Sequence, residues 1–323
     1  MTNSEQLVAL TAVDQGYENL ILFADDIVLL FHGDNWQQVY EHAESGLKNV
    51  TAWLDNNLLT LNATKTNYLC FSKSSNHNLV NHGLKITLHT FACNKEITKE
   101  CTCNILTRAK SIRYLGVHVD DTLSWKDHIT HICSRVRRLI YIFKQLRTVA
   151  DVRTLILTYR ALCQSILYYC ITVWGGVPKS RLIDLERAQR AILKVLMRLP
   201  YRHPTTALYE ESRVLSVRKL FILQSLLRLH RTTATLLIHS SKRKFRCPIP
   251  LTKTSFAQRH YNFLAPWIYN QVQAQSDTNI ASLSYFTFKK YITQWLISLD
   301  YDGTESFFKN SSIKQSLQED AAS

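Results

Sequence analysis

Two adjacent carboxylates, Asp25 and Asp26, are the side chains in this sequence whose type and spacing best suit a chemical role. They stand between two apolar runs, residues 19–23 and 27–31, each of strand length. So short a connection predicts a hairpin with both carboxylates at its tip, where Asp is a favoured turn residue. Two neighbouring carboxylates repel each other unless a cation lies between them, and their oxygens suit Mg²⁺. A pair of such ions can drive phosphoryl transfer; the alternative is an ordinary solvated turn.

The segments after the hairpin are predicted to build a sheet with a helix on it. Asp34 and Gln37 are spaced as a capping box, and apolar residues then recur at helical intervals as far as residue 54. An alternating stretch over residues 58–71 ends in an apolar strand, with Lys65 at its entrance. Lys65 is either a solvated loop cation or a cation placed near a phosphate group. Residues 111–120 predict a strand pair that bends at Gly116.

The chain is predicted to be helical from about residue 126 onward. Apolar residues recur at intervals of three and four within residues 129–146, 152–169, 182–199 and 214–235. Short connections between such helices favour a small antiparallel bundle. Arg and Lys occupy the polar faces of the first and third of these segments. A basic face suits the phosphate backbone of a nucleic acid, although such a face is more often only solvated.

The charge balance favours a polyanionic partner. Lys and Arg number 39 against 25 Asp and Glu, which gives a net charge of +14 in 323 residues. A membrane surface is the rival polyanion, but no run of 18 apolar residues occurs and no membrane partner is expected. The N-terminal residues have no basic segment typical of a signal peptide. The expected location is therefore intracellular, nuclear or cytoplasmic, and not secreted.

The cysteine pattern favours free thiols over a metal site. Eight cysteines are scattered along the chain, mostly within apolar patterns, which is typical of a reduced intracellular protein. Four residues lie close enough in sequence to suggest zinc, namely His89, Cys93, Cys101 and Cys103. Their spacing matches no standard zinc finger, because there is one short Cys-x-Cys and no second close pair. Reduced cysteines in strands are the preferred interpretation.

The tetrapeptide Phe23-Ala24-Asp25-Asp26 resembles the aromatic-Ala-Asp-Asp catalytic box of reverse transcriptases. The continuation is similar to polymerases of non-LTR retrotransposons of the LINE type, jockey-like elements in particular. Residues 53–66 resemble the next palm motif, and residues 114–129 resemble the primer-grip strand and the entrance to the thumb. Residues 168–190 resemble the helical region that follows. The resemblance covers residues 17 to about 298.

This resemblance implies an α+β fold. A partial polymerase palm, made of an antiparallel hairpin with an Asp-Asp turn plus a helix, is followed by a mainly α-helical thumb and C-terminal region. The expected division is a partial palm over residues 1–122 and a helical thumb and connection bundle over residues 123–240. A C-terminal helical region is expected over residues 241–300, and a disordered tail over residues 301–323.

The resemblance also assigns roles to individual residues. It implies that Asp25 binds the catalytic Mg²⁺, or Mn²⁺ in its place, and that Asp26 supports this site as a further metal ligand. Lys65 is expected near the leaving pyrophosphate, as a general acid or a charge clamp. Seven residues are expected to contact the primer or the nucleic-acid duplex: Phe23, Tyr114, Leu115, Gly116, Lys126, Arg135 and Arg138. The implied partners are an RNA template, a DNA primer or hybrid duplex, and dNTP.

One departure from the family pattern limits what this chain is expected to do. The family's third catalytic carboxylate and its fingers precede the Asp-Asp box by a long stretch, whereas 24 residues precede Asp25 here. The chain therefore resembles the C-terminal half of a polymerase, without its N-terminal half. The hairpin is expected to lack partner strands and to leave an open sheet edge.

The expected function is a truncated RNA-directed DNA polymerase that is inactive as this fragment, so whether it is an enzyme stays undecided at this point. Two alternatives remain open. A non-catalytic, basic nucleic-acid-binding module would use the helices after residue 125. A structural or protein-interaction fragment would leave its basic residues merely solvated.

Overall fold

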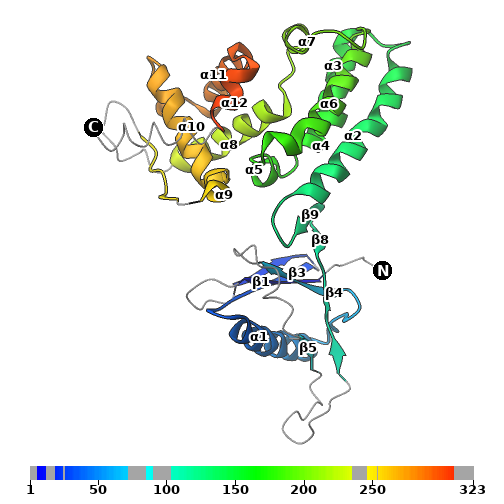
Figure 1. Ribbon diagram of the computed structural model, residues 1–323, viewed down its shortest axis with the longest axis vertical. Coiled ribbons are helices and arrows are strands. Elements are labelled where there is room, and N and C mark those ends of the chain that lie inside the picture. The colour runs from blue at the N-terminus through cyan, green and yellow to red at the C-terminus, as the bar shows by residue number, and fades with distance from the viewer. Residues whose placement is uncertain are drawn as a thin grey trace, which may run out of the picture. The chain divides into compact units, whose positions relative to one another are not determined.

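The computed structural model describes residues 6–11, 19–24, 26–71, 85–89, 103–234, 246–252 and 254–308. The chain divides into two units, Met1–His128 and Ile129–Ser323. The first unit carries the described strands and one long helix, and the second unit is built from helices (Figure 1). The fold is therefore α+β, as the sequence predicts.

The first unit is organised around a five-stranded sheet. Its strands follow the spatial order β2 (Asn19–Phe23), β3 (Asp26–His32), β1 (Gln6–Thr11), β4 (Thr66–Phe71) and β7 (Thr107–Arg108). β2 and β3 form the predicted antiparallel hairpin, while β1 runs parallel to both β3 and β4. The expectation that the hairpin would lack a partner strand is thus wrong for β3, because β1 pairs with its residues 28–32. β2 lies at the end of the sheet.

Helix α1 (Trp36–Asn56) covers one face of this sheet (Figure 1). Its helical stripe of Val39, Ala43 and Leu47 is buried in a cluster with Leu29 and Phe31 of β3. The predicted stripe therefore packs as expected, because residues spaced three and four apart share one helix face. The N-cap lies one residue later than the predicted capping box.

The true N-cap of α1 is Asn35, whose side chain accepts a 2.9 Å hydrogen bond from the backbone N–H of Gln38. In return, the Gln38 side-chain oxygen accepts a 3.0 Å hydrogen bond from the backbone N–H of Asp34. The Asn35–Gln38 bond is that of a capping box moved one position along the chain from Asp34 and Gln37, although the return bond goes to Asp34, the residue before the cap, rather than to the cap itself. Asn at the N-cap satisfies an N–H that the helix itself leaves without a partner.

The opposite face of the sheet is covered by a second hairpin, formed by β8 (Ser111–Tyr114) and β9 (Val117–Asp120). Ile112 of β8 is buried in a cluster with Val28 of β3 and Leu69 of β4, and Val119 packs against it. Both faces of β3 are therefore covered, which explains why its sequence is a continuous apolar run rather than an alternating one. A short antiparallel pair, β5 (Thr87–Leu88) with β6 (Asn104–Ile105), completes the described strands.

The second unit consists of helices. They are α2 (Lys126–Leu146, which begins in the last residues of the first unit), α3 (Val152–Tyr159), a π-helical turn (Arg160–Gln164), α4 (Ser165–Tyr168), α5 (Ile171–Trp174), α6 (Lys179–Leu196), α7 (Thr205–Ser212), α8 (Val217–Ala234), α9 (Ser255–Gln258), α10 (Tyr261–Gln275), a 3₁₀ turn (Ile280–Ser282), α11 (Tyr285–Ser298) and α12 (Tyr301–Ser306). No described helix has the length and apolar character needed to cross a membrane.

Helix α8 is the centre of the second unit. Its residues Leu220, Phe221, Ile222, Leu223 and Leu226 are all buried, although they point in different directions around the helix axis. A helix that is apolar all round needs neighbours on every side. Here α4, α5, α6, α10, α11 and α12 all pack against it.

The predicted disordered tail is wrong for residues 301–308. Asp300 caps α12 by accepting a 2.6 Å hydrogen bond from the backbone N–H of Gly303, and Thr304, Glu305 and Phe307 are buried. The polar composition of this segment suggested disorder. In the structure its polar groups are satisfied by specific hydrogen bonds rather than by water, so the segment can pack. Residues 309–323 lie outside the described part of the chain.

Candidate functional site

The tip of the β2–β3 hairpin carries the first predicted site residues. Phe23 and Asp26 pair across the two strands, and Ala24 lies in the turn at the end of β2. Ala24 has a φ of 54°, the left-handed conformation that two-residue hairpin turns require. Phe23 is 60% exposed beside the tip. Asp25, the predicted principal metal ligand, lies outside the described residues.

Asp26 shares a sheet face with the β8–β9 hairpin. Because side chains alternate along a strand, Asp26 points to the same face as Val28, which packs against Ile112 in the second hairpin. Tyr114 belongs to this cluster. Burial raises the pKa of Tyr114, and the negative charge of Asp26 raises it further. The structure thus brings together Asp26 and Tyr114, two predicted site residues far apart in the sequence.

The predicted primer-grip residues form the turn of the β8–β9 hairpin. Tyr114 pairs with Val117, and the connecting residues Leu115 and Gly116 have φ values of 44° and 80°. Glycine adopts this conformation freely, whereas a branched residue such as Leu115 is strained by about 1–2 kcal/mol there. Such strain persists only where the surrounding packing holds it. The turn therefore keeps Tyr114 at the end of β8.

Lys65 lies at the same end of the sheet as Asp26. Leu7 of β1 is in register with both Val28 of β3 and Asn67 of β4. Asp26 in β3 and Lys65 in the turn just before β4 each precede these partners by two residues, so both lie at this end of the sheet, on either side of β1. Neighbouring strands are about 4.8 Å apart, which places the two backbones roughly 10 Å from each other. One end of the sheet therefore carries both the predicted carboxylate and the predicted cation.

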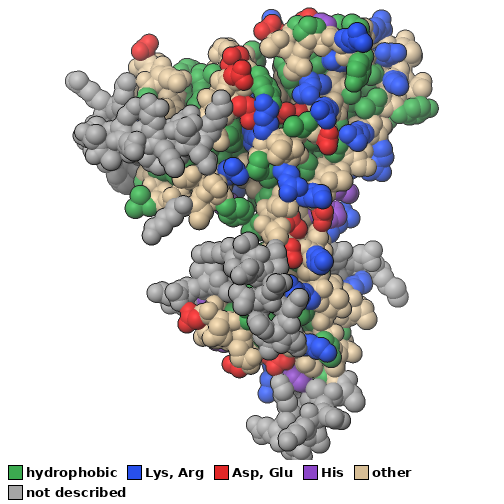
Figure 2. Space-filling model, in the orientation of Figure 1, with side chains coloured by type: hydrophobic (Ala, Val, Ile, Leu, Met, Phe, Trp, Pro, Cys, Tyr) green, Lys and Arg blue, Asp and Glu red, His purple; other side chains and the backbone are tan. Residues whose placement is uncertain are grey.

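The remaining predicted nucleic-acid contacts lie on α2. Lys126, Arg135 and Arg138 are exposed. Residues 129–146 contain four Arg or Lys and no Asp or Glu. Figure 2 shows Lys and Arg side chains recurring over α2 and the helices beside it. The one acidic residue of α2 is Asp127 in its first turn, so the part of the helix that carries Arg135 and Arg138 presents positive charge without a carboxylate of its own.

Sequence reasoning missed an aromatic residue on this basic face. Tyr141 is 69% exposed and follows Arg137 and Arg138 by four and three residues, while Lys144 comes three residues later. Residues at these spacings are neighbours on a helix surface, so the ring lies among three cations. The sequence could have pointed to Tyr141, because it is an aromatic residue outside the apolar stripe of an amphipathic helix.

Sequence reasoning also missed the residue that positions the start of α2. The buried Asp120 carboxylate accepts hydrogen bonds from the backbone N–H groups of Ser124 (2.8 Å) and Trp125 (2.7 Å) and from Thr122. Burial alone would raise its pKa, but these hydrogen bonds outweigh burial and lower it. Leu123 and Trp125 both have positive φ values, 51° and 60°, in the turn that the carboxylate holds. Asp120 therefore holds the turn formed by residues 121–125, directly before α2 begins.

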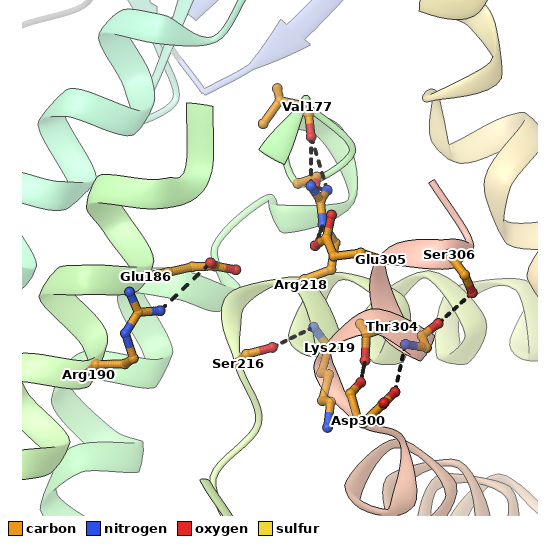
Figure 3. Close-up of polar contacts among 12 residues, drawn as sticks. Val177, Glu186, Arg190, Ser216, Arg218, Lys219, Asp300, Thr304, Glu305 and Ser306 are labelled. Carbon is orange, nitrogen blue, oxygen red and sulfur yellow. Dashed lines mark hydrogen bonds and ion pairs between the residues drawn. The ribbon is translucent and has the colours of Figure 1, made fainter. Parts of the chain in front are cut away.

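A second cluster of charged residues is buried around Arg218 in the second unit (Figure 3). Its guanidinium donates to Glu305 at 3.1 Å, to the Gly175 carbonyl at 2.9 Å, and twice to the Val177 carbonyl at 3.0 Å. Burial lowers the Arg218 pKa, and the Glu305 charge opposes this shift. All three nitrogens of this cation donate to groups that tie α12 and the segment after α5 to α8, so its role is structural.

Glu186, also buried, lies 3.9 Å from Arg190 in the same region (Figure 3). Burial raises the pKa of Glu186, while the positive charge of Arg218 lowers it. A cavity of about 140 Å³ lies beside Arg218, lined by residues of both charges including Lys219 and Asp300. With opposite charges already close to one another, this cavity offers no distinct preference for a charged ligand.

The predicted metal sites lack a full set of ligands in the part of the chain that the structure describes. There, no three His, Cys, Asp or Glu side chains are grouped so that they could hold a metal ion. His89 and Cys103 are described, whereas Cys93 and Cys101 fall outside the described residues, as does Asp25. The described cysteines are free thiols. Asp26 by itself does not form a Mg²⁺ site, and Mg²⁺ or Mn²⁺ binding stays a prediction.

Comparisons with protein-family models, with curated proteins and with solved structures found no match for this chain. Its function must therefore be inferred from the residues and from their geometry within each unit. Two features bear on that inference. One is the end of the sheet that carries Phe23, Asp26, Lys65 and Tyr114, and the other is the basic face of α2.

Proposed function

We propose that this chain is the late-palm and thumb portion of a reverse transcriptase of the non-LTR retrotransposon type. The observation that carries the proposal is the placement of Asp26 and Tyr114 on one face of the sheet, each beside the turn of a hairpin. The first hairpin carries the Asp-Asp box, and the second carries the Tyr114-Leu115-Gly116 turn. This arrangement suits a surface that holds the 3′ end of a primer against a carboxylate.

In this proposal the side chains at the end of the sheet each bind a different part of the primer or of the incoming dNTP. The exposed ring of Phe23 packs against the terminal nucleotide of the primer, and the Tyr114 turn supports the primer backbone. Lys65, just before β4, lies at the same end of the sheet as Asp26. In the proposal its ammonium group neutralises the charge on the pyrophosphate of an incoming dNTP or supplies it with a proton. Asp26 provides the negative charge that such a site requires.

The chain on its own is proposed to lack polymerase activity. Two-metal nucleotidyl transfer needs several carboxylates held around the ions, and its rate depends strongly on their geometry. The described residues offer Asp26 at this position and no group of three candidate ligands. The complete polymerases of the resembled family use Mg²⁺ or Mn²⁺, but no step of that chemistry is assigned to this chain.

The basic face of α2 is proposed to contact the sugar-phosphate backbone of the RNA–DNA duplex. Arg135 and Arg138 are exposed, and no described carboxylate forms an ion pair with either of them. Each phosphate that such a cation neutralises releases bound counterions, so binding must weaken as salt rises. Backbone contacts of this kind position a duplex without reading its sequence.

Primer extension on an RNA template tests the catalytic part of the proposal. The purified chain, with Mg²⁺ and dNTPs, is expected to incorporate no more nucleotide than its Asp25→Asn/Asp26→Asn variant. Extension by the natural chain that disappears in the variant would contradict the proposed inactivity. It would mean that the carboxylates assemble a working site with a further ligand or a second copy of the chain.

Binding of a primer–template tests the thumb. Replacing Arg135 and Arg138 by Gln removes two charges from α2, and replacing the exposed Lys289 and Lys290 of α11 removes two charges elsewhere. The slope of log affinity against log salt is expected to fall by about 1.8 in the α2 variant, at about 0.9 per phosphate contact. Equal effects of both variants would show that only net charge matters, which would contradict a specific role for α2.

A non-catalytic nucleic-acid-binding module is the second candidate, and Tyr141 among its basic neighbours favours it. An exposed aromatic ring between cations suits stacking on unpaired bases as well as contact with phosphates. A polymerase portion should prefer a primer–template junction over single-stranded RNA, whereas a module of this kind should bind both alike. Competition between the two ligands in a fluorescence-anisotropy assay separates the candidates. Failure to bind any nucleic acid would instead favour a structural fragment.

A further inference from the structure

A second pocket in the helical unit has properties that the polymerase proposal does not use. Its volume is about 360 Å³, and it lies among the turn between α4 and α5, the C-terminal half of α8 and the start of α11. Tyr168, Thr172, Arg228, Arg231 and Tyr285 contribute to its lining, and none of the described lining residues is acidic. The pocket therefore combines two cations with aromatic and hydroxyl groups.

The two arginines are held in place by aromatic rings rather than by carboxylates. The guanidinium carbon of Arg228 is 4.8 Å from the ring centroid of Tyr261, and that of Arg231 is 4.4 Å from the ring centroid of Tyr285. Arg228 also donates a long hydrogen bond, 3.4 Å, to the hydroxyl of Thr172. Neither arginine forms an ion pair with a carboxylate in the described part of the chain.

The consequence is a pair of oriented but uncompensated positive charges. Arg228 and Arg231 are three residues apart on α8 and therefore point from the same side of the helix. A guanidinium group carries several donors in a fixed plane that matches the oxygens of a phosphate. Contact with a tyrosine ring helps to hold each guanidinium group in position and does not use its N–H donors. Two such groups in one pocket favour an anion with several oxygens.

The aromatic lining adds a preference for a planar group beside that anion. Tyr168 and Tyr285 line the pocket, and the guanidinium group of Arg231 lies over the Tyr285 ring. Nucleic-acid bases stack on aromatic rings and on guanidinium planes whatever their sequence. The volume of about 360 Å³ lies within the roughly 300–1,000 Å³ range of small-molecule sites.

We propose that this pocket binds one nucleotide unit, with its phosphate on Arg228 and Arg231 and its base against Tyr168 and Tyr285. The unit is either a free nucleotide or one residue of a single-stranded nucleic acid, since both present the same phosphate and base. The assignment is independent of the polymerase proposal. All of its residues belong to the second unit, and none lies in the hairpins that carry Asp26 and Tyr114.

The test uses the full chain and an Arg228→Gln/Arg231→Gln variant, with Lys289→Gln/Lys290→Gln as a charge-matched control on α11. A short fluorescent single-stranded oligonucleotide is titrated at several salt concentrations. The pocket variant is expected to lose affinity by roughly 10- to 100-fold, because two charge-assisted contacts are removed. Its salt slope should fall by about 0.7, because one phosphate of the single strand loses its cations. The control should change far less.

Two further ligands distinguish the source of the nucleotide and the role of the base. Adenosine monophosphate is followed by saturation-transfer NMR, with inorganic phosphate as competitor. Binding of the free nucleotide supports a mononucleotide site, and binding of the oligonucleotide alone supports a strand-binding site. Phosphate that competes as well as the nucleotide would overturn the proposal, because the base would then contribute nothing.

Two further variants distinguish a loss of binding from a loss of folding. Arg228→Lys/Arg231→Lys keeps both charges, so it should keep the salt slope while losing the guanidinium plane and part of the affinity. Tyr168→Leu removes a pocket ring that holds neither arginine. It should lower the affinity for adenosine monophosphate and leave that for inorganic phosphate unchanged. Equal affinity of the natural chain, the Gln variant and the α11 control would overturn the proposal, provided that circular dichroism shows all three to be folded.

Discussion

Replacing Glu305 by Ala should destabilise the helical unit strongly, because it leaves a buried cation without its counter-ion. The Arg218 side chain is 2% exposed and the Glu305 side chain 10% exposed, and their atoms Nε and Oε1 are 3.1 Å apart. The Arg218 guanidinium also donates to the carbonyls of Gly175 and Val177. The cation cannot turn toward water without breaking these bonds. It therefore stays buried when Glu305 is removed.

The expected magnitude follows from the burial of the pair. Removing one partner of a buried ion pair typically costs about 3–5 kcal/mol, since the other charge is left uncompensated. The pair of Arg187 with Asp184 provides the contrast, because its side chains are 66% and 67% exposed. Exposed pairs contribute about 0–1 kcal/mol. For a unit of this size, a loss of 3–5 kcal/mol corresponds to a fall in Tm of roughly 6–20 °C.

The assay is urea unfolding followed by circular dichroism, with scanning calorimetry to separate the transitions of the two units. Glu305→Ala should shift the helical transition, whereas Asp184→Ala, the matched control, should leave it nearly unchanged. An Arg218→Met/Glu305→Leu variant removes both charges and should recover part of the loss. The recovery should be incomplete, because the carbonyls of Gly175 and Val177 lose their donors. A cost below about 1 kcal/mol for Glu305→Ala would refute the reasoning, because a loss that small is typical of exposed pairs.

Three further changes test other parts of the structure. Burial raises the folded-state pKa of Glu186, so its charged form opposes folding as pH rises through that pKa. Glu186→Gln should therefore increase stability to urea at neutral pH and leave it unchanged in acid. The Asp120 pKa is lowered by hydrogen bonds that outweigh burial, so its contribution is present at neutral pH and is lost as pH falls through the folded-state pKa. Asp120→Asn should cost about 1–3 kcal/mol at neutral pH, because the Trp125 N–H loses a charged acceptor, and urea unfolding should show the difference shrinking in acid. Gly176→Ala should lower the Tm of the helical unit, at a cost of about 1–3 kcal/mol, because the new methyl group would overlap the backbone oxygen of Arg259; an unchanged Tm would contradict that packing.

The sequence by itself determined the local elements of this protein. The β2–β3 hairpin, the apolar stripe of α1 and the turn at Leu115 and Gly116 follow from residues that are neighbours in the chain. Their signals are periodicity and turn chemistry, which depend on short-range geometry. The N-cap of α1 was misplaced by one residue, because Asp34 and Asn35 are both good caps and the backbone conformation decides between them.

The candidate site was predicted in part. The sequence located Asp26, Lys65 and Tyr114 in separate segments, but β1 as the strand between β3 and β4 is a feature of the tertiary structure. The register through β1 is what brings Asp26 and Lys65 to the same end of the sheet. Asp120 and Tyr141 were missed as contributors, because a polar residue ending a strand and an aromatic residue on a helix have many ordinary roles.

Only the tertiary structure decided which charged residues are buried. In the sequence, Arg218 resembles the exposed arginines around it, and Glu305 lies in a polar segment expected to be disordered. They meet across 87 positions of the chain, and their burial is tolerated because each satisfies the other. The same holds for Arg228 and Arg231, whose tyrosine partners come from other helices. Local sequence patterns specify helices and strands. Long-range packing determines whether a charged side chain is exposed to water, paired with a counter-ion or lines a pocket.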